Sequence, residues 1–376
     1  MKQLKIIQDL NMGSDPEFFF RKDGNVIGSE KVIPENGLHH MRGYGKIVRD
    51  GVQAELNPHA TMCRQTACTN IQQVFSVLAG TLKQKKNNGV TIDISRVVDV
   101  SKQEMDTLSK KSKTFGCAAS MNANIKKIDK ISNITVDPTV YLKRSAGGHL
   151  HLGYPKPYSE EDFDREIHVY DNTSAKIQQA RWVQGYDRAR NPEIIIPLLD
   201  IIVGNTCVLL DRDEGNIERR KVYGKAGEYR TPAHGIEYRT PSNFWLQSPH
   251  LASMVYGLAR QAVEMAVQSD DDNNYLKELK KLVSMADIEK AINNNDFDLA
   301  MYNWEQIENF MVSVTPNDGF YPIIGENLPQ FKHVVETGID KWFSKDIKKE
   351  WIDNPYLRFG FNWWLLYEVK HAMNNK

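Results

Sequence analysis

The segment Gly148-His-Leu-His-Leu-Gly153 alternates strictly between polar and apolar side chains. Successive side chains of a β-strand point to opposite faces of the sheet, so the two leucines would share one face and the two histidines the other. A sheet with one apolar face and one polar face is typical of antiparallel proteins. The segment therefore predicts an antiparallel sheet whose polar face carries imidazole rings.

Three other segments, at residues 15–20, 52–57 and 236–240, show the same alternation. In the first, two carboxylates two residues apart would lie about 7 Å from each other on one face. The opposite, apolar faces are built from residues such as Leu56 and Ile236. The four predicted polar faces carry Asp15 and Glu17; Gln53, Glu55 and Asn57; His149 and His151; and Glu237 and Arg239.

These polar faces differ in composition from an ordinary solvated sheet face, which mixes Lys, Thr, Ser and Glu. Carboxylates together with histidine are suitable ligands for Mg²⁺ or Mn²⁺. Carboxylates that face one another repel unless a cation lies between them. The pattern predicts a metal site if the four strands are neighbours, and four separate solvated faces if they are not.

A basic segment with two glycines precedes the last of these strands. Guanidinium groups match phosphate oxygens with two parallel hydrogen bonds, so such a segment suits a nucleotide polyphosphate bridged by metal. The alternative is a solvated basic loop. The sequence contains neither a G-x-x-x-x-G-K-[ST] P-loop nor a Rossmann G-x-G-x-x-G after a strand. The basic residues are Arg219, Arg220, Lys221, Lys225 and Arg230, followed by Arg239.

Periodicity along the chain predicts an α+β fold, an antiparallel sheet flanked by helices and followed by a helical region. We expect a catalytic domain over residues 1–249 and a helical region over 250–376, packed on it or appended to it. Residues 104–135 are polar and irregular, either a flap or an ordinary surface loop. Strands are predicted at 16–20, 26–27, 46–48, 52–56, 91–100 and 147–154, and one strand or a strand pair at 228–240. Helices are predicted at 69–86, 174–187, 192–210, 250–268, 274–293, 303–312, 328–343 and 355–373.

Charge and cysteine usage narrow the class of protein. The 48 basic and 48 acidic residues balance, so nothing calls for a nucleic-acid or anionic-membrane partner. The four cysteines are scattered without a C-x-x-C, which favours reduced thiols. The N-terminus lacks the apolar core of a signal peptide, and no run reaches the roughly 18 apolar residues of a membrane span. We expect a cytoplasmic protein.

Five segments together resemble the phage-type COOH–NH2 ligases, or amidoligases, of the glutamine synthetase and glutamate–cysteine ligase superfamily. They occur in the order expected for that family, and no motif could be matched after residue 250. If the protein is phage-encoded, its location would be the host cytoplasm. The segments are Gly13–Phe20, Asp50–Pro58, Ser145–Tyr154, Tyr223–Arg230 and Gly235–Leu246.

The resemblance implies a sheet like that of glutamine synthetase, with Mg²⁺ or Mn²⁺ held around the phosphates of ATP. It departs from the family at Asp15, where Glu is usual, and at Ala118-Ala-Ser120, where a Pro-Asp step is expected. Asp50 is a candidate for a further acidic ligand. The implied roles are metal binding for Asp15, Glu17, Glu55, His149 and Glu237; catalysis for Arg239, Arg219 and Glu237; ATP binding for Arg219, Arg220, Lys225, Arg230 and Arg239; and substrate binding for His151, Asn57 and Asn243.

The implied reaction is amide formation through an acyl phosphate. The partners would be a small-molecule or peptide carboxylate and an amine, with a modified nucleobase as a further conceivable acceptor, and the chain could form a homo-oligomer. Two other classes remain open at this point. One is a phosphotransferase of the guanidine-kinase type on a similar sheet; the other is a non-catalytic phage protein, a virion or host-binding component, that retains the fold.

Overall fold

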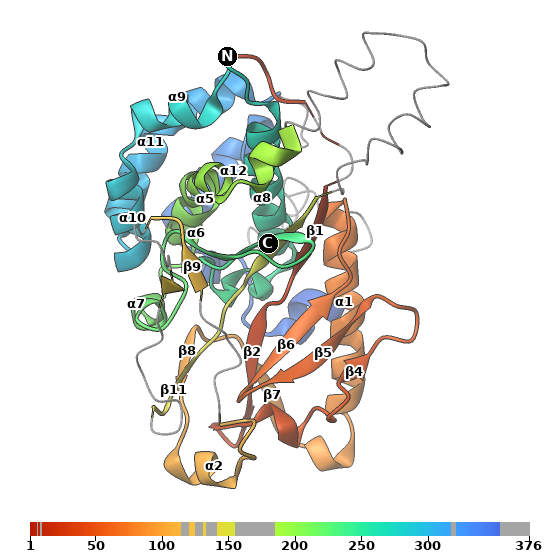
Figure 1. Cartoon of the computed structure of the whole chain (residues 1–376). Coiled ribbons are helices and arrows are strands. Elements are labelled where there is room, and N and C mark those ends of the chain that lie inside the picture. The colour runs from red at the N-terminus through yellow and green to blue at the C-terminus, as the bar shows by residue number, and fades with distance from the viewer. Residues whose placement is uncertain are drawn as a thin grey trace, which may run out of the picture.

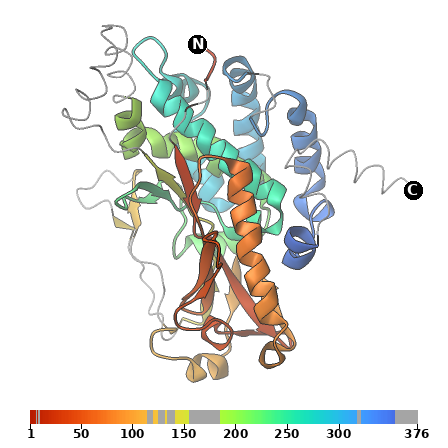
Figure 2. The same ribbon diagram turned by 90° about the vertical axis from the view of Figure 1, so that its right-hand side faces the viewer.

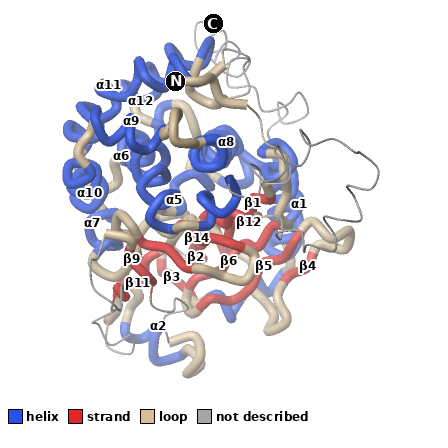
Figure 3. Tube along the Cα trace, turned by 45° about the horizontal axis from the view of Figure 1, so that its top comes forward, coloured by secondary structure: helices blue, strands red, loops and turns tan. Residues whose placement is uncertain are grey.

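The computed structural model describes residues 1–5, 7, 10–113, 120–124, 131–132, 141–154, 185–316 and 321–353. It is an α+β protein with antiparallel strands and a helical C-terminal part, as predicted. Figures 1 and 2 show the N-terminal strands in one half of the molecule and the helices after residue 190 in the other. Figure 3 shows the strands as a layer with most of the helices on one side.

The expected single sheet is two sheets in this structure. The first sheet has the strand order β1-β12-β14-β13-β9-β10, and all its neighbours pair antiparallel. Its apolar face is buried in the protein core and includes Leu150, Leu152, Ile236 and Tyr238. The strands are β1 (Asn11–Ser14), β9 (Ser120–Asn122), β10 (Ile131–Ser132), β12 (Leu150–Gly153), β13 (Glu228–Arg230) and β14 (Gly235–Tyr238).

The second sheet has the order β3-β2-β6-β5-β4, with β7 paired to β2. Two glycines with positive φ, Gly24 and Gly51, stand in the Asp-Gly turns that connect its hairpins. A separate two-stranded ribbon pairs β8 with β11. The strands are β2 (Glu17–Lys22), β3 (Asn25–Ile27), β4 (Leu38–His39), β5 (Gly45–Asp50), β6 (Gln53–Pro58), β7 (Val90–Asp93), β8 (Val97–Asp99) and β11 (Lys143–Ser145).

Helix α1 (Arg64–Leu82) packs on the second sheet through the apolar stripe that its 3.6-residue period predicts. Ile71, Val74, Phe75 and Leu78 in this stripe are fully buried, and the Phe75 ring lies 6.0 Å from that of Phe18 on β2. Figure 2 shows α1 running the length of these strands. The helix thus fixes the strands that carry Glu17 and Glu55.

The predicted helix at 192–210 forms as α5 (Pro192–Leu199), a π-helical turn (Asp200–Gly204) and α6 (Asn205–Leu210). By length and hydropathy alone this stretch would pass for a membrane span, but 89% of it is buried inside the protein. It packs against α8 (Pro249–Gln268) and α11 (Phe297–Val314), as a core helix does. Its apolar character therefore reflects burial within the fold.

The remaining C-terminal helices pack into the same continuous hydrophobic core, which runs from Leu4 to Trp351. The helix expected at 274–293 is two helices, because Val283 leaves the helical conformation and Ser284 caps a new helix by accepting from Ala286 N–H. These helices are α9 (Tyr275–Leu282), α10 (Met285–Asn294) and α12 (Leu328–Thr337). Two further short helices, earlier in the chain, are α2 (Lys102–Thr107) and α7 (Gly215–Arg220).

Other expectations need correction or fall outside the described residues. The strand expected at 91–100 is two strands, β7 and β8. The segment 104–135 is not wholly irregular, because β9 pairs with β13 in the first sheet, a long-range pairing that local sequence does not reveal. Most of the helix expected at 174–187, and all of that at 355–373, lies outside the described residues. The described cysteines, Cys63, Cys68 and Cys207, are free thiols.

Candidate functional site

The two sheets meet at the short segment Asp15-Pro16-Glu17. β1 ends at Ser14 and β2 begins at Glu17, so the single strand expected over these residues is interrupted. Pro16 has no N–H to give to a ladder, and its carbonyl accepts from Leu56 N–H in the second sheet. As a result Asp15 belongs to a cluster beside the first sheet, and Glu17 to a cluster on the second.

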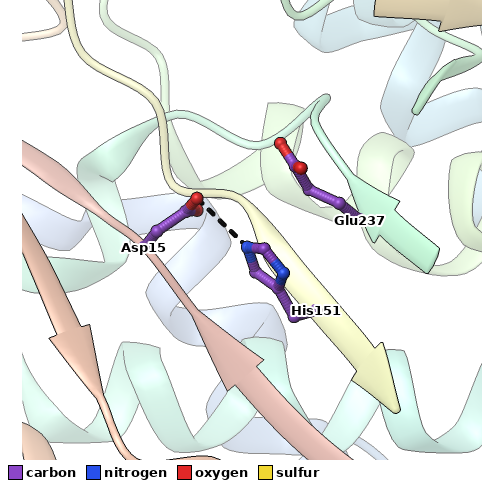
Figure 4. Close-up of side chains that lie close together, drawn as sticks. All are labelled: Asp15, His151 and Glu237. Carbon is purple, nitrogen blue, oxygen red and sulfur yellow. Dashed lines mark ion pairs between the residues drawn. The ribbon is translucent and has the colours of Figure 1, made fainter. Parts of the chain in front are cut away.

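The first cluster contains Asp15, His151 and Glu237. Strand pairing places Gly13 opposite His151, His151 opposite Glu237, and Glu237 opposite Arg230, so these positions form one row across the sheet. One ligand atom from each of Asp15, His151 and Glu237 lies within 4.8 Å of the others. Figure 4 shows the three side chains converging from three neighbouring segments.

Charges inside this cluster are complementary. Nε2 of His151 lies 3.1 Å from Oδ2 of Asp15, and Nδ1 of His149 lies 3.2 Å from Oδ1 of the same carboxylate. Burial alone would raise the pKa of Asp15, but the charges and hydrogen bonds of the two histidines lower it well below its usual range. Burial alone would lower the pKa of His151, whereas Asp15 raises it above its usual value. Asp15 is therefore ionised at neutral pH.

The second cluster contains Glu17, Asp50 and Glu55, with one oxygen of each within 4.8 Å of the others. Glu17 pairs directly with Glu55, and Asp50 on the adjacent β5 occupies the same face. Burial, followed by repulsion from Glu17, raises the pKa of Asp50 to about 8. Burial, followed by repulsion from Asp15 and Asp50, raises the pKa of Glu55 to about 9. The Asn57 amide donates to Oε1 of Glu55 over 2.7 Å.

Both clusters fit divalent cations. Ligand oxygens on opposite sides of an octahedral Mg²⁺ are about 4.2 Å apart, and the ligand atoms of each cluster all lie within 4.8 Å of one another. In the first cluster, Asp15 Oδ1, His151 Nε2 and Glu237 Oε1 are all buried, and each lies within 3.2 Å of a charged or titratable partner. In the second cluster, burial and mutual repulsion disfavour the ionised forms of the carboxylates, which is why their pKa values are raised. A bound cation would offset this repulsion and stabilise the ionised carboxylates. Asp15-Pro16-Glu17 joins the two clusters, so two ions would be neighbours.

Two arginines flank the first cluster. Arg239 is fully buried, with Nε 3.1 Å from Oε1 of Glu237, and it donates to the Ser120 hydroxyl over 2.6 Å. Arg230 is partly exposed, with a guanidinium nitrogen 3.5 Å from the same Glu237 oxygen. A polyanion next to Glu237 would therefore meet two guanidinium groups on one side. The phosphate-binding roles expected for these two arginines stay predictions.

The structure does not bring every predicted residue to this place. The buried guanidinium of Arg219 donates to the carbonyls of Arg239, Thr240 and Pro241. Arg220 is also buried and donates to Asn295 Oδ1 at the end of α10. Arg219 thus bonds to backbone carbonyls and Arg220 to a side chain of the protein itself, so these contacts give no support to the phosphate-binding roles expected for the two arginines.

Two further predicted residues, Lys225 and Asn243, lie outside the two clusters. Lys225 is exposed on the loop before β13, and its carbonyl accepts from the Thr240 hydroxyl. The buried Asn243 amide donates to the backbone carbonyl of Glu17 over 2.9 Å, so it supports the strand that carries a cluster member. His149, a predicted metal ligand, is buried, with Nδ1 3.2 Å from Oδ1 of Asp15 and 3.7 Å from Oε1 of Glu237.

Tyr223 is a central residue to which the sequence assigned no role. Its hydroxyl donates to Oε2 of Glu17 over 2.7 Å, and the guanidinium carbons of Arg219 and Arg239 lie 4.8 and 5.3 Å from its ring centre. The His149 ring meets the same ring edge-to-face at 5.6 Å. The sequence shows that Tyr223 lies in the basic segment. The neighbouring residues in the sequence do not indicate that it contacts Glu17 of the second cluster and Arg239 beside the first.

The glycines before the histidine strand make room for protein rather than for a ligand. A Cβ on Gly148 would lie 2.2 Å from the Ser242 carbonyl oxygen and 2.4 Å from Nε1 of Trp245. Gly147 donates its N–H to Oε2 of Glu17 over 2.7 Å, and its carbonyl accepts from Glu17 N–H. The close approach at this point is therefore between two segments of the chain, and it fixes the orientation of Glu17.

Comparison with known proteins supports the resemblance seen in the sequence. Residues 191–351 match the family model of the phage phiEco32-like COOH.NH2 ligases, type 2. The match includes Arg230, Glu237 and Arg239, and it extends through the helices after residue 250, where no motif was recognised. No curated protein matches the chain.

Proposed function

We propose that this chain, which matches a family of carboxylate–amine ligases over residues 191–351, uses ATP and Mg²⁺ or Mn²⁺ to form an amide. The observation that carries the proposal is the pair of adjoining carboxylate clusters with two arginines beside one of them. Carboxylates alone would bind cations. Carboxylates with flanking guanidinium groups suit a polyphosphate that is bridged to the protein by cations.

The chemistry requires activation because a carboxylate is a poor electrophile. One oxygen of the substrate carboxylate attacks the γ-phosphorus of ATP, the bond to the β–γ bridging oxygen breaks, and ADP leaves. The amine nitrogen then attacks the carbonyl carbon of the acyl phosphate, phosphate leaves with the electron pair of the C–O bond, and the nitrogen loses a proton. The products are an amide, ADP and inorganic phosphate.

In this scheme some side chains of the protein bind the cations and others bind the transferring phosphoryl group. Asp15, His151 and Glu237 would hold one cation, and Glu17, Asp50 and Glu55 another. When bound, the cations would screen the phosphate charges from the attacking carboxylate. Arg239 and Arg230 would bind the transferring phosphoryl group and stabilise the charge that develops on it. Buried Arg239 has little freedom to move, so its contribution is preorganised.

The test measures ADP release and amide formation with purified protein, ATP, Mg²⁺ and panels of carboxylates and amines. Glu237→Gln removes one negative charge at almost constant volume and should lower the rate at least 100-fold. Glu305→Gln, the same change at an exposed position on α11, is the matched control and should keep full activity. Full activity in Glu237→Gln would refute the site, and a stable phosphorylated product without an amide would show a phosphotransferase instead.

A further inference from the structure

His234 lies outside the two clusters but contacts one of their members. It stands in the turn between β13 and β14, and its Nε2 lies 3.0 Å from Nδ1 of His151, with ring centres 5.1 Å apart. On its other side, Nε2 of His151 lies 3.1 Å from Asp15. The His151 ring is therefore held between His234 and Asp15.

The backbone around His234 is well fixed for such a contact. The Gly235 N–H bonds to the Pro232 carbonyl across the turn, and the His234 carbonyl accepts from Tyr154 N–H at the end of β12. The side chain of His234 is nevertheless exposed. The residue thus has a defined position without a packing role in the core.

The two contacts favour different tautomers of a neutral His151. A proton on Nε2 would be donated to Asp15, and that tautomer has no lone pair on Nε2 for a metal. A proton on Nδ1 would be donated to His234, and Nε2 would then face Asp15 and Glu237 with a free lone pair. Histidine ligands of metals usually donate their second ring N–H to a neighbouring acceptor in this way.

We propose that His234 is a positioning residue that accepts the Nδ1–H of His151 and so makes His151 a metal ligand. This inference rests on the proposed function, because it deepens the account of the first cluster. It moves His151 from the substrate contacts expected from the sequence to the set of metal ligands. Without His234, Nδ1 would lose this acceptor, and donation of the ring proton from Nε2 to Asp15 would favour the Nε2–H tautomer.

The direct test is Mn²⁺ binding to the full-length protein without ATP, followed by electron paramagnetic resonance. His234→Ala should weaken one of two Mn²⁺ sites about 10-fold, the usual size of an outer-partner effect. His234→Gln keeps a side-chain acceptor and should recover part of the loss. Thr231→Ala, an exposed change in the same turn, should bind as the wild type does, and the Glu17–Asp50–Glu55 site should be unaffected in every variant.

A second measurement does not depend on any variant. Long-range ¹⁵N–¹H correlation spectra of the Mg²⁺-loaded wild type should show the proton of His151 on Nδ1. A proton on Nε2, or unchanged Mn²⁺ affinity in His234→Ala, would overturn the inference while leaving the ligase proposal in place. If the wild type binds no Mn²⁺ at all, the metal premise of the proposed function fails instead, and this inference fails with it.

Discussion

The hydroxyl of Tyr223 donates a hydrogen bond of 2.7 Å to Oε2 of Glu17, a residue 206 positions away in the chain. The same tyrosine ring lies against Arg219 and Arg239. One side chain thus links a predicted metal ligand with a predicted phosphate ligand.

Tyr223→Phe should weaken Mg²⁺ binding about 10-fold and leave the fold intact. The ring would still pack against the two guanidinium groups, but Glu17 would lose one of the donors that fix its carboxylate, and such outer partners typically contribute about 10-fold or more in affinity. Tyr223→Leu would also remove the aromatic support of Arg239, so it should lower kcat in addition. Titration calorimetry with Mg²⁺ and steady-state kinetics distinguish the two effects; equal behaviour of both variants would contradict the assignment.

The second carboxylate cluster predicts how stability depends on pH. The pKa values of Asp50 and Glu55, about 8 and 9, lie above the values of roughly 4 expected in the unfolded chain. At a pH between the unfolded and the folded pKa values, the folded state binds more protons than the unfolded state. Folding is therefore most favourable at the acidic end of this pH window and less favourable as the pH rises. The stability of the metal-free protein should therefore fall as the pH rises from about 5 to 9.

Thermal melts at pH 6 and pH 9, with EDTA or with Mg²⁺, check this prediction. Mg²⁺ should raise Tm more at pH 9 than at pH 6, because it binds the deprotonated carboxylates. A double variant, Asp50→Asn with Glu55→Gln, should lose most of the pH dependence and most of the Mg²⁺ effect at this cluster. A Tm of the metal-free wild type that rises steadily from pH 6 to pH 9 would contradict the prediction.

Arg219 should act on stability rather than on ATP affinity. Its guanidinium is fully buried and donates to three backbone carbonyls, which a shorter lysine side chain with one ammonium group cannot all reach. Arg219→Lys should cost about 2 to 4 kcal/mol of unfolding free energy, since buried acceptors are left unsatisfied. Urea unfolding measures this cost. A variant of normal stability with a much higher KM for ATP would restore the phosphate-binding role that the sequence suggests.

The buried ion pair between Arg96 and Asp211 should be a strong determinant of stability. Arg96 donates two hydrogen bonds of 2.8 and 3.0 Å to Oδ1 of Asp211, and the same carboxylate accepts from Asn216 over 2.7 Å. Asp211→Ala should cost about 3 to 5 kcal/mol, because it strands a buried charge. Lys345→Ala, which breaks an exposed pair with Asp340, should cost at most about 1 kcal/mol. Similar costs for both variants, measured by urea unfolding, would contradict the argument.

The sequence alone identified most of the candidate site. Alternation of polar and apolar residues placed His151, Glu237 and Glu55 on polar strand faces, and the structure agrees because the opposite faces are buried. The sequence could not show that the strands belong to two different sheets, or that Asp15 and Glu17 belong to different clusters. That division depends on Pro16 interrupting the ladder and on which segments pair with each side.

The roles of the arginines show the same limit. Composition marked Arg219, Arg220, Arg230 and Arg239 alike as candidates for phosphate binding. Only the fold distinguishes the two that border Glu237 from the two that donate to backbone carbonyls or to Asn295. A side chain's partner is set by long-range packing, which residue type and spacing do not encode.

What the sequence by itself determined is the fold class, the polar strand faces and their carboxylate and imidazole chemistry, because side-chain periodicity is a local property of the chain. What only the tertiary structure decided is the grouping of those residues into two adjoining clusters, with Asp50 completing one and Tyr223 and His234 supporting their members. Those contacts join residues far apart in the chain, and they exist only once both sheets have packed against the helices.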